Sequence, residues 1–284
     1  MTQLAFHTLN GIAFGMLLFL LAAGLSLIYG LMKILNLTHG SYYLLAGYIG
    51  LTVIQRTESF LLAVIAATLA VALIGAVMER FFLRRFHLDE LAQTLLTFGF
   101  LFMFADLALW IWGGHPQTLP KPPLLDGSMQ IGEFTYPSYR LFIIVVGLAV
   151  GAALWWFQER TRVGAMLRAG VDDQEIARAL GINVSLLFTL TFALGAFLAA
   201  LGGVLGGPLI GMFPGADFEV LLLAFVVVIV GGLGSLKGAL VGGLLVGLLD
   251  NFGKAFFPEL ALFTIFVPMA AILAVRPTGL FGQQ

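Results

Sequence analysis

The sequence predicts an all-α protein that crosses a membrane about eight or nine times, and its composition and its repeated apolar segments predict this class. Of the 284 residues, 60% are hydrophobic and 10% are charged, whereas soluble domains carry about 25% charged residues. The mean hydropathy is +1.03. A span needs about 20 apolar residues, and such segments recur too often here for one soluble core. We therefore expect a single polytopic transmembrane domain over residues 1–284.

Apolar segments can be followed along the whole chain. Three of them, the second, seventh and eighth, are short for full spans unless their glycines and flanking residues are included, so broken, tilted or re-entrant helices are expected there. For the same reason, the expected number of membrane spans is eight or nine. The segments cover residues 10–29, 41–54, 60–78, 94–112, 139–157, 186–205, 220–230, 239–249 and 260–275.

The distribution of basic residues predicts the orientation. With the N-terminus outside, ten of the 14 Lys and Arg residues fall in internal loops, as the positive-inside rule requires. This places residues 159–183 in the cytoplasm and residues 113–138 in a periplasmic loop. Five prolines exclude a long helix from that loop, and residues 130–134 are suited to a short strand or a hairpin arm. The loop either faces a periplasmic partner or only connects two spans.

Enzymatic and metal-binding chemistry is not expected. The chain has no Cys, and its four His residues lack metal-ligand spacing. Gly238 follows Lys237 where a P-loop has Ser or Thr, and no GxSxG elbow occurs. The formal net charge of −1 gives no reason to expect a nucleic-acid partner. The first ten residues lack Lys and Arg, so no cleaved signal peptide is expected.

A polar island over residues 159–183 contains a short predicted helix. Asp172 is a good N-cap, and Glu175 stands three residues later, as in a capping box. Gly181 supplies the left-handed residue that ends the helix. A helix of about two turns, roughly 12 Å long, is too short to be stable alone. Flanking segments and a partner are therefore expected to hold it. Its body comprises Ile176, Ala177, Ala179 and Leu180.

Several polar residues stand close to apolar runs. Asp106 is the costliest at membrane depth, where a charge usually marks function. It either lines a path, contacts a substrate ammonium or a basic residue of another subunit, or makes a structural hydrogen bond. Asn36 and His39 lie in a break after the first segment, which is either part of a transport path or a simple cytoplasmic turn. Asp217 and Glu219 are interpreted as helix-capping residues.

Glycine is frequent, with 35 residues, and many pairs lie four residues apart, among them Gly11/Gly15 and Gly243/Gly247. This spacing lets two helix backbones approach closely. Tight packing and hinged or sliding helices are both consistent with it.

The ordered motifs resemble the permease subunit of ATP-binding-cassette importers of the branched-chain (hydrophobic) amino-acid class, over nearly the whole chain. The sequence departs from this pattern at Ile176, where the coupling motif has Ala, and at Asp106, where a neutral polar residue is expected. The motifs that carry the resemblance are residues 10–11, 23–30, 34–40 and 79–80, Arg160 to Gly164, Arg168-Ala169, Glu175-x-Ala177-x3-Gly181-Ile182-Asn183, Gly231 to Ser235 and Arg276 to Gly282.

The resemblance implies a bacterial inner-membrane assembly with a second homologous permease, two ATP-binding subunits and a periplasmic substrate-binding protein. The partner subunits would hold ATP and Mg, and this chain would hold no cofactor. Asn36, His39 and Asp106 would belong to the translocation path. Arg162, Arg168 and Arg178 would either pair with acidic residues of the ATPase or anchor the loop by the positive-inside rule. The residues implied in coupling to the ATPase are Asp172, Glu175, Ile176, Ala177, Arg178 and Gly181.

A self-contained channel or facilitator for a small neutral solute, such as urea or a short amide, is the alternative. It would need a pore in one chain and would have no use for a docking helix. Branched-chain amino acids are the default substrate, while aromatic acids, other carboxylates and amides remain open.

Overall fold

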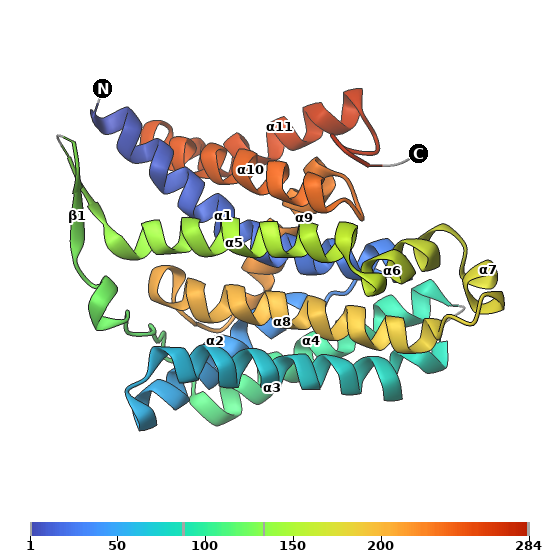
Figure 1. Cartoon of the computed structure of the whole chain (residues 1–284). Helices are drawn as coiled ribbons and strands as arrows, with labels where there is room; N and C mark the ends of the chain where they lie inside the picture. Colours follow the sequence, from blue (N-terminus) through green and yellow to red (C-terminus); the bar gives the residue numbers. More distant parts are fainter. Residues whose placement is uncertain (1, 87–88, 133, 283–284) are drawn as a thin grey trace.

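The computed structural model describes residues 2–86, 89–132 and 134–282, and it is a helical bundle with one β-hairpin at its edge (Figure 1). We call the end of the bundle that carries the hairpin the hairpin end, and the opposite end the α7 end. The helices are α1 (Thr2–Met32), α2 (His39–Thr57), α3 (Phe60–Phe81), α4 (Glu90–Trp112), α5 (Ser138–Arg160), α6 (Arg162–Asp172), α7 (Gln174–Ala179), α8 (Val184–Ile210), α9 (Ala216–Gly231), α10 (Leu236–Phe256) and α11 (Ala261–Val275).

All nine expected segments coincide with helices. Within the described residues, seven helices are long and apolar enough to cross a membrane. The two remaining segments are α2, with 19 residues, and α9, with 16 residues. The eighth segment reaches the length of a full span once its flanking residues are included, because α10 has 21 residues. Polar and small residues at both ends of α10 continue the helix beyond the apolar stretch.

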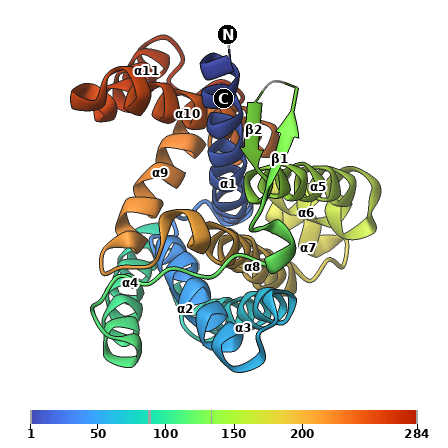
Figure 2. The same ribbon diagram turned by 90° about the vertical axis from the view of Figure 1, so that its left-hand side faces the viewer.

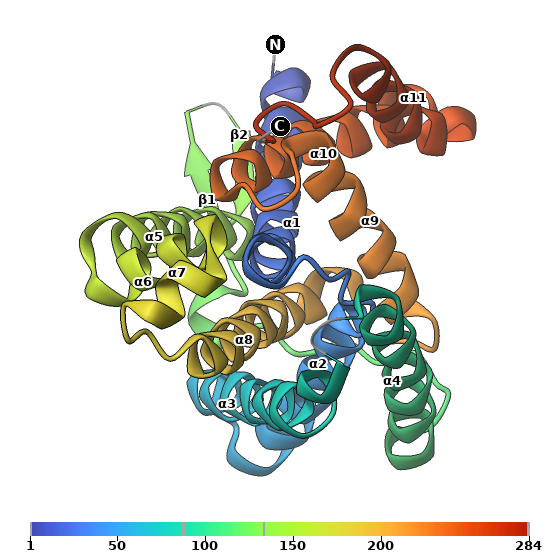
Figure 3. The same cartoon turned by 90° about the vertical axis from the view of Figure 1, so that its right-hand side faces the viewer.

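Helix α1 lies at the centre of the bundle, between α5, α8, α9 and α10 (Figure 3). Its glycines let α10 approach closely. A Cβ atom at Gly15 would lie 2.7 Å from the carbonyl oxygen of Gly243, and one at Gly11 would lie 3.1 Å from that of Gly247. The predicted close approach of backbones is confirmed for these pairs, and it fixes the relative position of the two helices.

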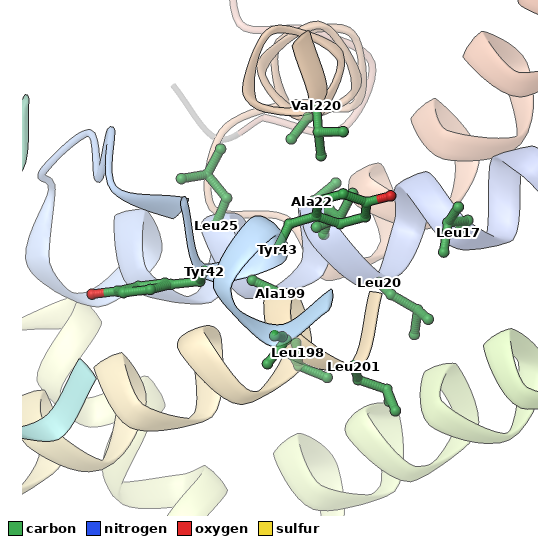
Figure 4. Close-up of a cluster of buried hydrophobic side chains, with 14 of the residues drawn as sticks. Leu17, Leu20, Ala22, Leu25, Tyr42, Tyr43, Leu198, Ala199, Leu201 and Val220 are labelled. Carbon is green, nitrogen blue, oxygen red and sulfur yellow. The ribbon is translucent and has the colours of Figure 1, made fainter. Parts of the chain in front are cut away.

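The core is formed where α2 enters between α1 and α8. Figure 4 shows Tyr42 and Tyr43 of α2 among aliphatic side chains from α1, α8 and Val220 of α9. Both tyrosines are fully buried. Burying aromatic rings of this size contributes strongly to packing, so α2, although too polar for a simple span, is held firmly inside the bundle.

Helices α2 and α9 both begin inside the bundle. Residues 33–38 form an irregular segment after α1, and Asn36 and Thr38 on it are fully buried. Residues 211–215 connect the end of α8 to the start of α9, and Gly211 and Gly215 in this connection have positive φ. The first turn of α2 meets the first turn of α9, because a Cβ atom at Gly40 would collide with the carbonyl oxygen of Asp217. The prediction of broken helices at these two segments is confirmed.

The loop between α4 and α5 carries the hairpin and lies on the bundle. Strands β1 (Ser128–Ile131) and β2 (Phe134–Pro137) pair in antiparallel register. The expected hairpin arm is therefore confirmed, whereas a single strand over residues 130–134 is wrong, because Gly132 forms a turn between the two strands. Near the start of the loop, Gln117 and Met212 exchange backbone hydrogen bonds of 2.8 and 2.7 Å. The hairpin stands beside the N-terminal part of α1 (Figure 2).

One buried amide ties the hairpin to α1. The Oδ1 atom of Asn10 accepts hydrogen bonds from the hydroxyl of Tyr136 at 3.0 Å and from the guanidinium of Arg140 at 2.7 Å. Burial raises the pKa of the Tyr136 phenol, while the charge of Arg140 lowers it. The phenol therefore stays protonated at neutral pH and keeps its donor role.

Replacing Asn10 with Ala is expected to loosen the hairpin, because it removes the acceptor shared by the buried Tyr136 hydroxyl and the part-buried Arg140 guanidinium. Leaving such donors unpaired costs about 1–3 kcal/mol. Limited proteolysis of residues 113–137 in the purified chain measures the effect. Asn10→Asp is the matched control, because it keeps an acceptor for both donors. Equal cleavage rates for Asn10→Ala and the unaltered chain would show that the amide does not hold the hairpin.

Candidate functional site

The most exposed organised feature at the α7 end is α7 itself. Its N-cap is Asp173, whose Oδ1 accepts from the backbone N–H groups of Glu175 at 2.8 Å and Ile176 at 2.9 Å. The interpretation of Asp172 as the N-cap is therefore wrong, and no capping box forms with Glu175. The reason is α6, which Thr161 caps and which continues through Asp172. Asp173 alone takes the extended backbone conformation that an N-cap needs.

The end of α7 follows the prediction. Gly181 has φ +83°, its N–H donates to the carbonyl of Arg178, and the N–H of Ile182 donates to the carbonyl of Ala177, both at 3.0 Å. This is the paired arrangement of a Schellman motif. A rigid stop at both ends gives a six-residue helix of fixed direction.

The two faces of α7 differ sharply. Ala177 is buried against the chain itself, in a small cluster with Leu31, Leu167 and Val184. By contrast, the side chains of Ile176 and Leu180 are 60% and 73% exposed. Glu175 and Arg178 are exposed as well. Ile176 and Leu180 lie four residues apart, on one face, so α7 presents an apolar surface with charges around it.

Helix α7 is hydrogen-bonded to α1 and lies near the ends of α3 and α8. The side chain of Gln174 reaches the carbonyl of Leu31 at 3.5 Å. It shares a gap of about 30 Å³ with Glu79, Arg84 and Phe188. Glu79, fully buried, accepts from the Nη2 of Arg84 at 3.0 Å and from its Nε at 3.3 Å.

The same arginine also holds the start of α8. Its Nη2 donates to the carbonyl of Ser185 at 2.8 Å and to the hydroxyl of Thr189. Arg84 thereby ties the end of α3 to the start of α8. The sequence pattern pointed to the pair Glu79-Arg80, whereas the arginine that binds Glu79 is Arg84.

Removing the guanidinium by Arg84→Ala is expected to destabilise the chain by about 3–5 kcal/mol, because it leaves the Glu79 carboxylate buried without its partner. A lower Tm for thermal unfolding in detergent is the readout. Arg85→Ala serves as the control, since Arg85 is exposed and forms no ion pair among the described residues. If both variants unfold at the same temperature, the Arg84–Glu79 pair does not hold these helix ends.

Asn36 and His39 lie together inside the bundle. The Nε2 of His39 contacts the carbonyl of Leu21 at 2.9 Å, and Thr97 exchanges hydrogen bonds with the backbone and side chain of this segment. The segment over residues 36–40 is not an exposed turn, because α1 and α4 cover it. The Nδ2 of Asn36 and the Nδ1 of His39 have no hydrogen-bond partner among the described residues.

The two acidic candidates, Asp106 and Asp217, differ in position. Asp106 is exposed on the outer face of α4, so the structure does not bring it together with Asn36 and His39. Asp217 is buried in the first turn of α9, and Gly215 occupies the N-cap position. The capping role expected for Asp217 is therefore wrong. Among the described residues no group of three or more His, Asp or Glu could hold a metal ion, and His87 lies outside them.

Two of the motifs named above, Gly231 to Ser235 and Arg276 to Gly282, pack together as one unit. Backbone N–H groups of Leu280 and Phe281 donate to the carbonyls of Val230 and Gly231, both at 2.9 Å. Gly232, at φ +107°, gives the tail room, since a Cβ there would collide with the backbone of Gly282. Residues 276–282 thus clamp the turn between α9 and α10.

Sequence comparisons agree with this architecture. The family model described as "Branched-chain amino acid transport system / permease component" matches residues 7–274. The chain is 31% identical to the high-affinity branched-chain amino acid transport system permease protein BraD of Pseudomonas aeruginosa, over 96% of this chain and 94% of BraD. It is 27% identical to LivH of Escherichia coli, with the same coverage.

A more distant match is the ribose import permease protein RbsC of Escherichia coli, 26% identical over 82% of this chain and 73% of RbsC. No solved structure matches the chain at a significant level. The family model covers nearly all of the bundle, from α1 to α11. The chain therefore belongs to the permease family of branched-chain amino acid ATP-binding-cassette importers, and it is a multi-pass protein of the bacterial inner membrane.

Proposed function

We propose that this chain is a non-catalytic permease subunit that carries branched-chain amino acids inward together with a second homologous permease. The single observation that supports this most is α7, a capped helix with an exposed apolar face and a buried face docked on its own bundle. An exposed apolar pair on a stiff protrusion is suited to binding a soluble partner. The names of BraD and LivH supply the substrate class.

In this proposal the coupling loop over residues 159–183 lies in the cytoplasm and meets two ATP-binding subunits, which hold ATP and Mg. Ile176 and Leu180 enter the ATPase surface, while Glu175 and Arg178 pair with charges around it. Ala177 keeps α7 attached to the bundle. Asp173 and Gly181 fix the direction of the helix, and Asp172, at the end of α6, joins the two cytoplasmic helices.

Asp106 indicates where the second permease would lie. Its carboxylate is exposed on α4 between Met103 and Trp110, which share that outer face. A carboxylate facing lipid at this depth is costly, so the second permease is proposed to cover it and to form the translocation path there. Asn36 and His39 would support the path from inside, by holding the start of α2. The loop over residues 113–138 would face the periplasmic binding protein.

Reconstituted transport tests the proposal. Proteoliposomes containing this chain, the second permease and the ATPase subunits should take up labelled leucine only with ATP and the binding protein. The purified chain alone should pass neither leucine nor urea. Flux through the chain alone would instead support a channel, and failure to co-purify with an ATPase subunit would contradict the coupling role.

A further inference from the structure

The segment between α4 and the hairpin forms a strap, which we define as residues 114–122. Figure 2, which looks onto the hairpin end, shows it running from α4 past α2 and α8 toward the hairpin. Its backbone is irregular and contains Pro116, Pro120 and Pro122, which have no N–H group to donate. The strap is therefore held in place by a few particular contacts.

The first contact is a backbone bridge. Gln117 donates its N–H to the carbonyl of Met212 at 2.8 Å and accepts from the N–H of Met212 at 2.7 Å, as an isolated antiparallel pair. Met212 is fully buried in the connection between α8 and α9. A Cβ atom at Gly47 of α2 would lie 2.7 Å from the Met212 side chain. The bridge thus ties the strap to the connection that leads into α9, and through Met212 to α2.

The second contact is made by Leu119, the one buried residue of the strap, all of which the structure describes. A Cβ atom at Gly207 of α8 would lie 2.8 Å from Cδ1 of Leu119, closer than carbon atoms pack. One at Gly50 of α2 would lie 3.5 Å from Cδ2. Leu119 therefore fills a notch between α2 and α8, which Gly207 keeps open. An apolar contact of this kind has no fixed direction, so the side chain can leave and return.

The outer end of α4 is fastened at the same place. The side-chain amide of Gln117 donates to the carbonyl of Trp112 at 2.9 Å. Trp112 in turn donates to the hydroxyl of Thr52 at 2.8 Å and stacks on Tyr48, both on α2, with 5.2 Å between the ring centroids. Only 22% of the apolar stretch of α4 is buried, against 56% for α8. Elements with few buried contacts open most easily, so these contacts restrain a loosely packed helix.

We propose that the strap is a latch that holds the outer end of α4 against α2 until the loaded binding protein releases it. While Leu119 lies in the notch, the translocation path is closed on the outside. When Leu119 leaves the notch, α4 moves away from α2 and the path opens outward. This inference rests on the proposed function, which places the hairpin end in the periplasm and Asp106 of α4 on the path. The binding protein favours the open state because it contacts the released strap better than the seated one.

Thiol labelling of the complete complex tests the movement, because the chain has no Cys of its own. Leu119→Cys should be protected from a membrane-impermeant maleimide at rest. During turnover with ATP and loaded binding protein it should react about tenfold faster, as the open state changes from a minor to a major population. Leu124→Cys, at a fully exposed position, should react readily in both conditions, and Leu20→Cys, at a fully buried position in α1, in neither. Unchanged protection of Leu119→Cys during uptake overturns the proposal.

A disulfide tests whether the release is required. Paired residues of an antiparallel bridge have Cα atoms about 4.5–5.5 Å apart, within the disulfide range of about 4.4–6.8 Å. The complex with Gln117→Cys/Met212→Cys should lose leucine uptake when oxidised and regain it with dithiothreitol. Gln130→Cys/Thr135→Cys is the matched control, because this pair lies within the hairpin and should transport in both states.

The outcomes separate the latch from the proposed function. If the oxidised Gln117→Cys/Met212→Cys complex takes up leucine as fast as the reduced one, the latch is wrong and the importer remains. If the unaltered complex takes up no leucine, the proposed function itself fails. Should the double variant be inactive even when reduced, the labelling of Leu119→Cys decides.

Discussion

Replacing Leu180 with Asp is expected to abolish ATP-driven uptake while the chain still folds and inserts. Leu180 is 73% exposed, so its folded environment is mainly solvent and the substitution costs little stability. Buried in a partner groove, a Leu side chain contributes about 1.5–3 kcal/mol, and a buried, unpaired carboxylate costs still more. Together these effects would lower the affinity for the ATPase by more than about a hundredfold.

The measurement is co-purification of the ATPase subunits with the tagged permease, followed by leucine uptake in proteoliposomes. Ile176→Asp should behave in the same way, because Ile176 shares the exposed face. Leu124→Asp is the control for co-purification, since Leu124 is even more exposed but lies in the loop that carries the hairpin. Retention of ATPase subunits and uptake by Leu180→Asp would remove α7 from the coupling role.

The apolar segments were sufficient to predict where helices lie, because bilayer-spanning helices satisfy their own backbone groups and need little tertiary information. The same holds for Gly181, whose need for a left-handed backbone is local. The N-cap was harder to predict. Asp172 and Asp173 are chemically equivalent, and only the continuation of α6 from its cap at Thr161 decides between them.

The candidate site was less predictable, since it depends on how each helix is rotated about its axis. Asp106 lies in an apolar helix, and no periodic signal in α4 indicates which face is covered. Packing on α2 decides this, and it turns the carboxylate outward. From the sequence, Leu180 is expected only to form part of the helical body. Its spacing of four residues from Ile176 was the available signal for a docking face.

The buried position of the irregular segment before α2 is also difficult to predict from the sequence. A polar stretch between two apolar runs ordinarily predicts a loop in water. Here Thr38 and Thr97 supply hydrogen bonds to the buried backbone, and those bonds join residues about 60 positions apart. Such partners cannot be found from local sequence, although they make buried irregular backbone stable.

Replacing Gly40 with Ala is expected to disrupt the fold, and it tests the meeting of α2 and α9. The added methyl group would collide with the carbonyl oxygen of Asp217 and would approach Leu221 to 2.9 Å. Since the main obstacle is backbone, no side-chain rotation relieves it, and the cost should reach the upper part of the overpacking range, about 3 kcal/mol. We expect a much lower Tm and poor recovery of monodisperse protein.

Gly99→Ala is the matched control, because it adds the same methyl group to a helix in the same membrane domain. At Gly99, on the exposed face of α4, a Cβ meets nothing within 4 Å. This variant should therefore be recovered with a Tm equal to or slightly above that of the unaltered chain, because Ala favours a helix more than Gly does. If Gly40→Ala is equally stable, the first turns of α2 and α9 do not touch as described. In that case the buried segment with Asn36 and His39 would lose the support that α9 provides, and its part in the translocation path would have to be abandoned.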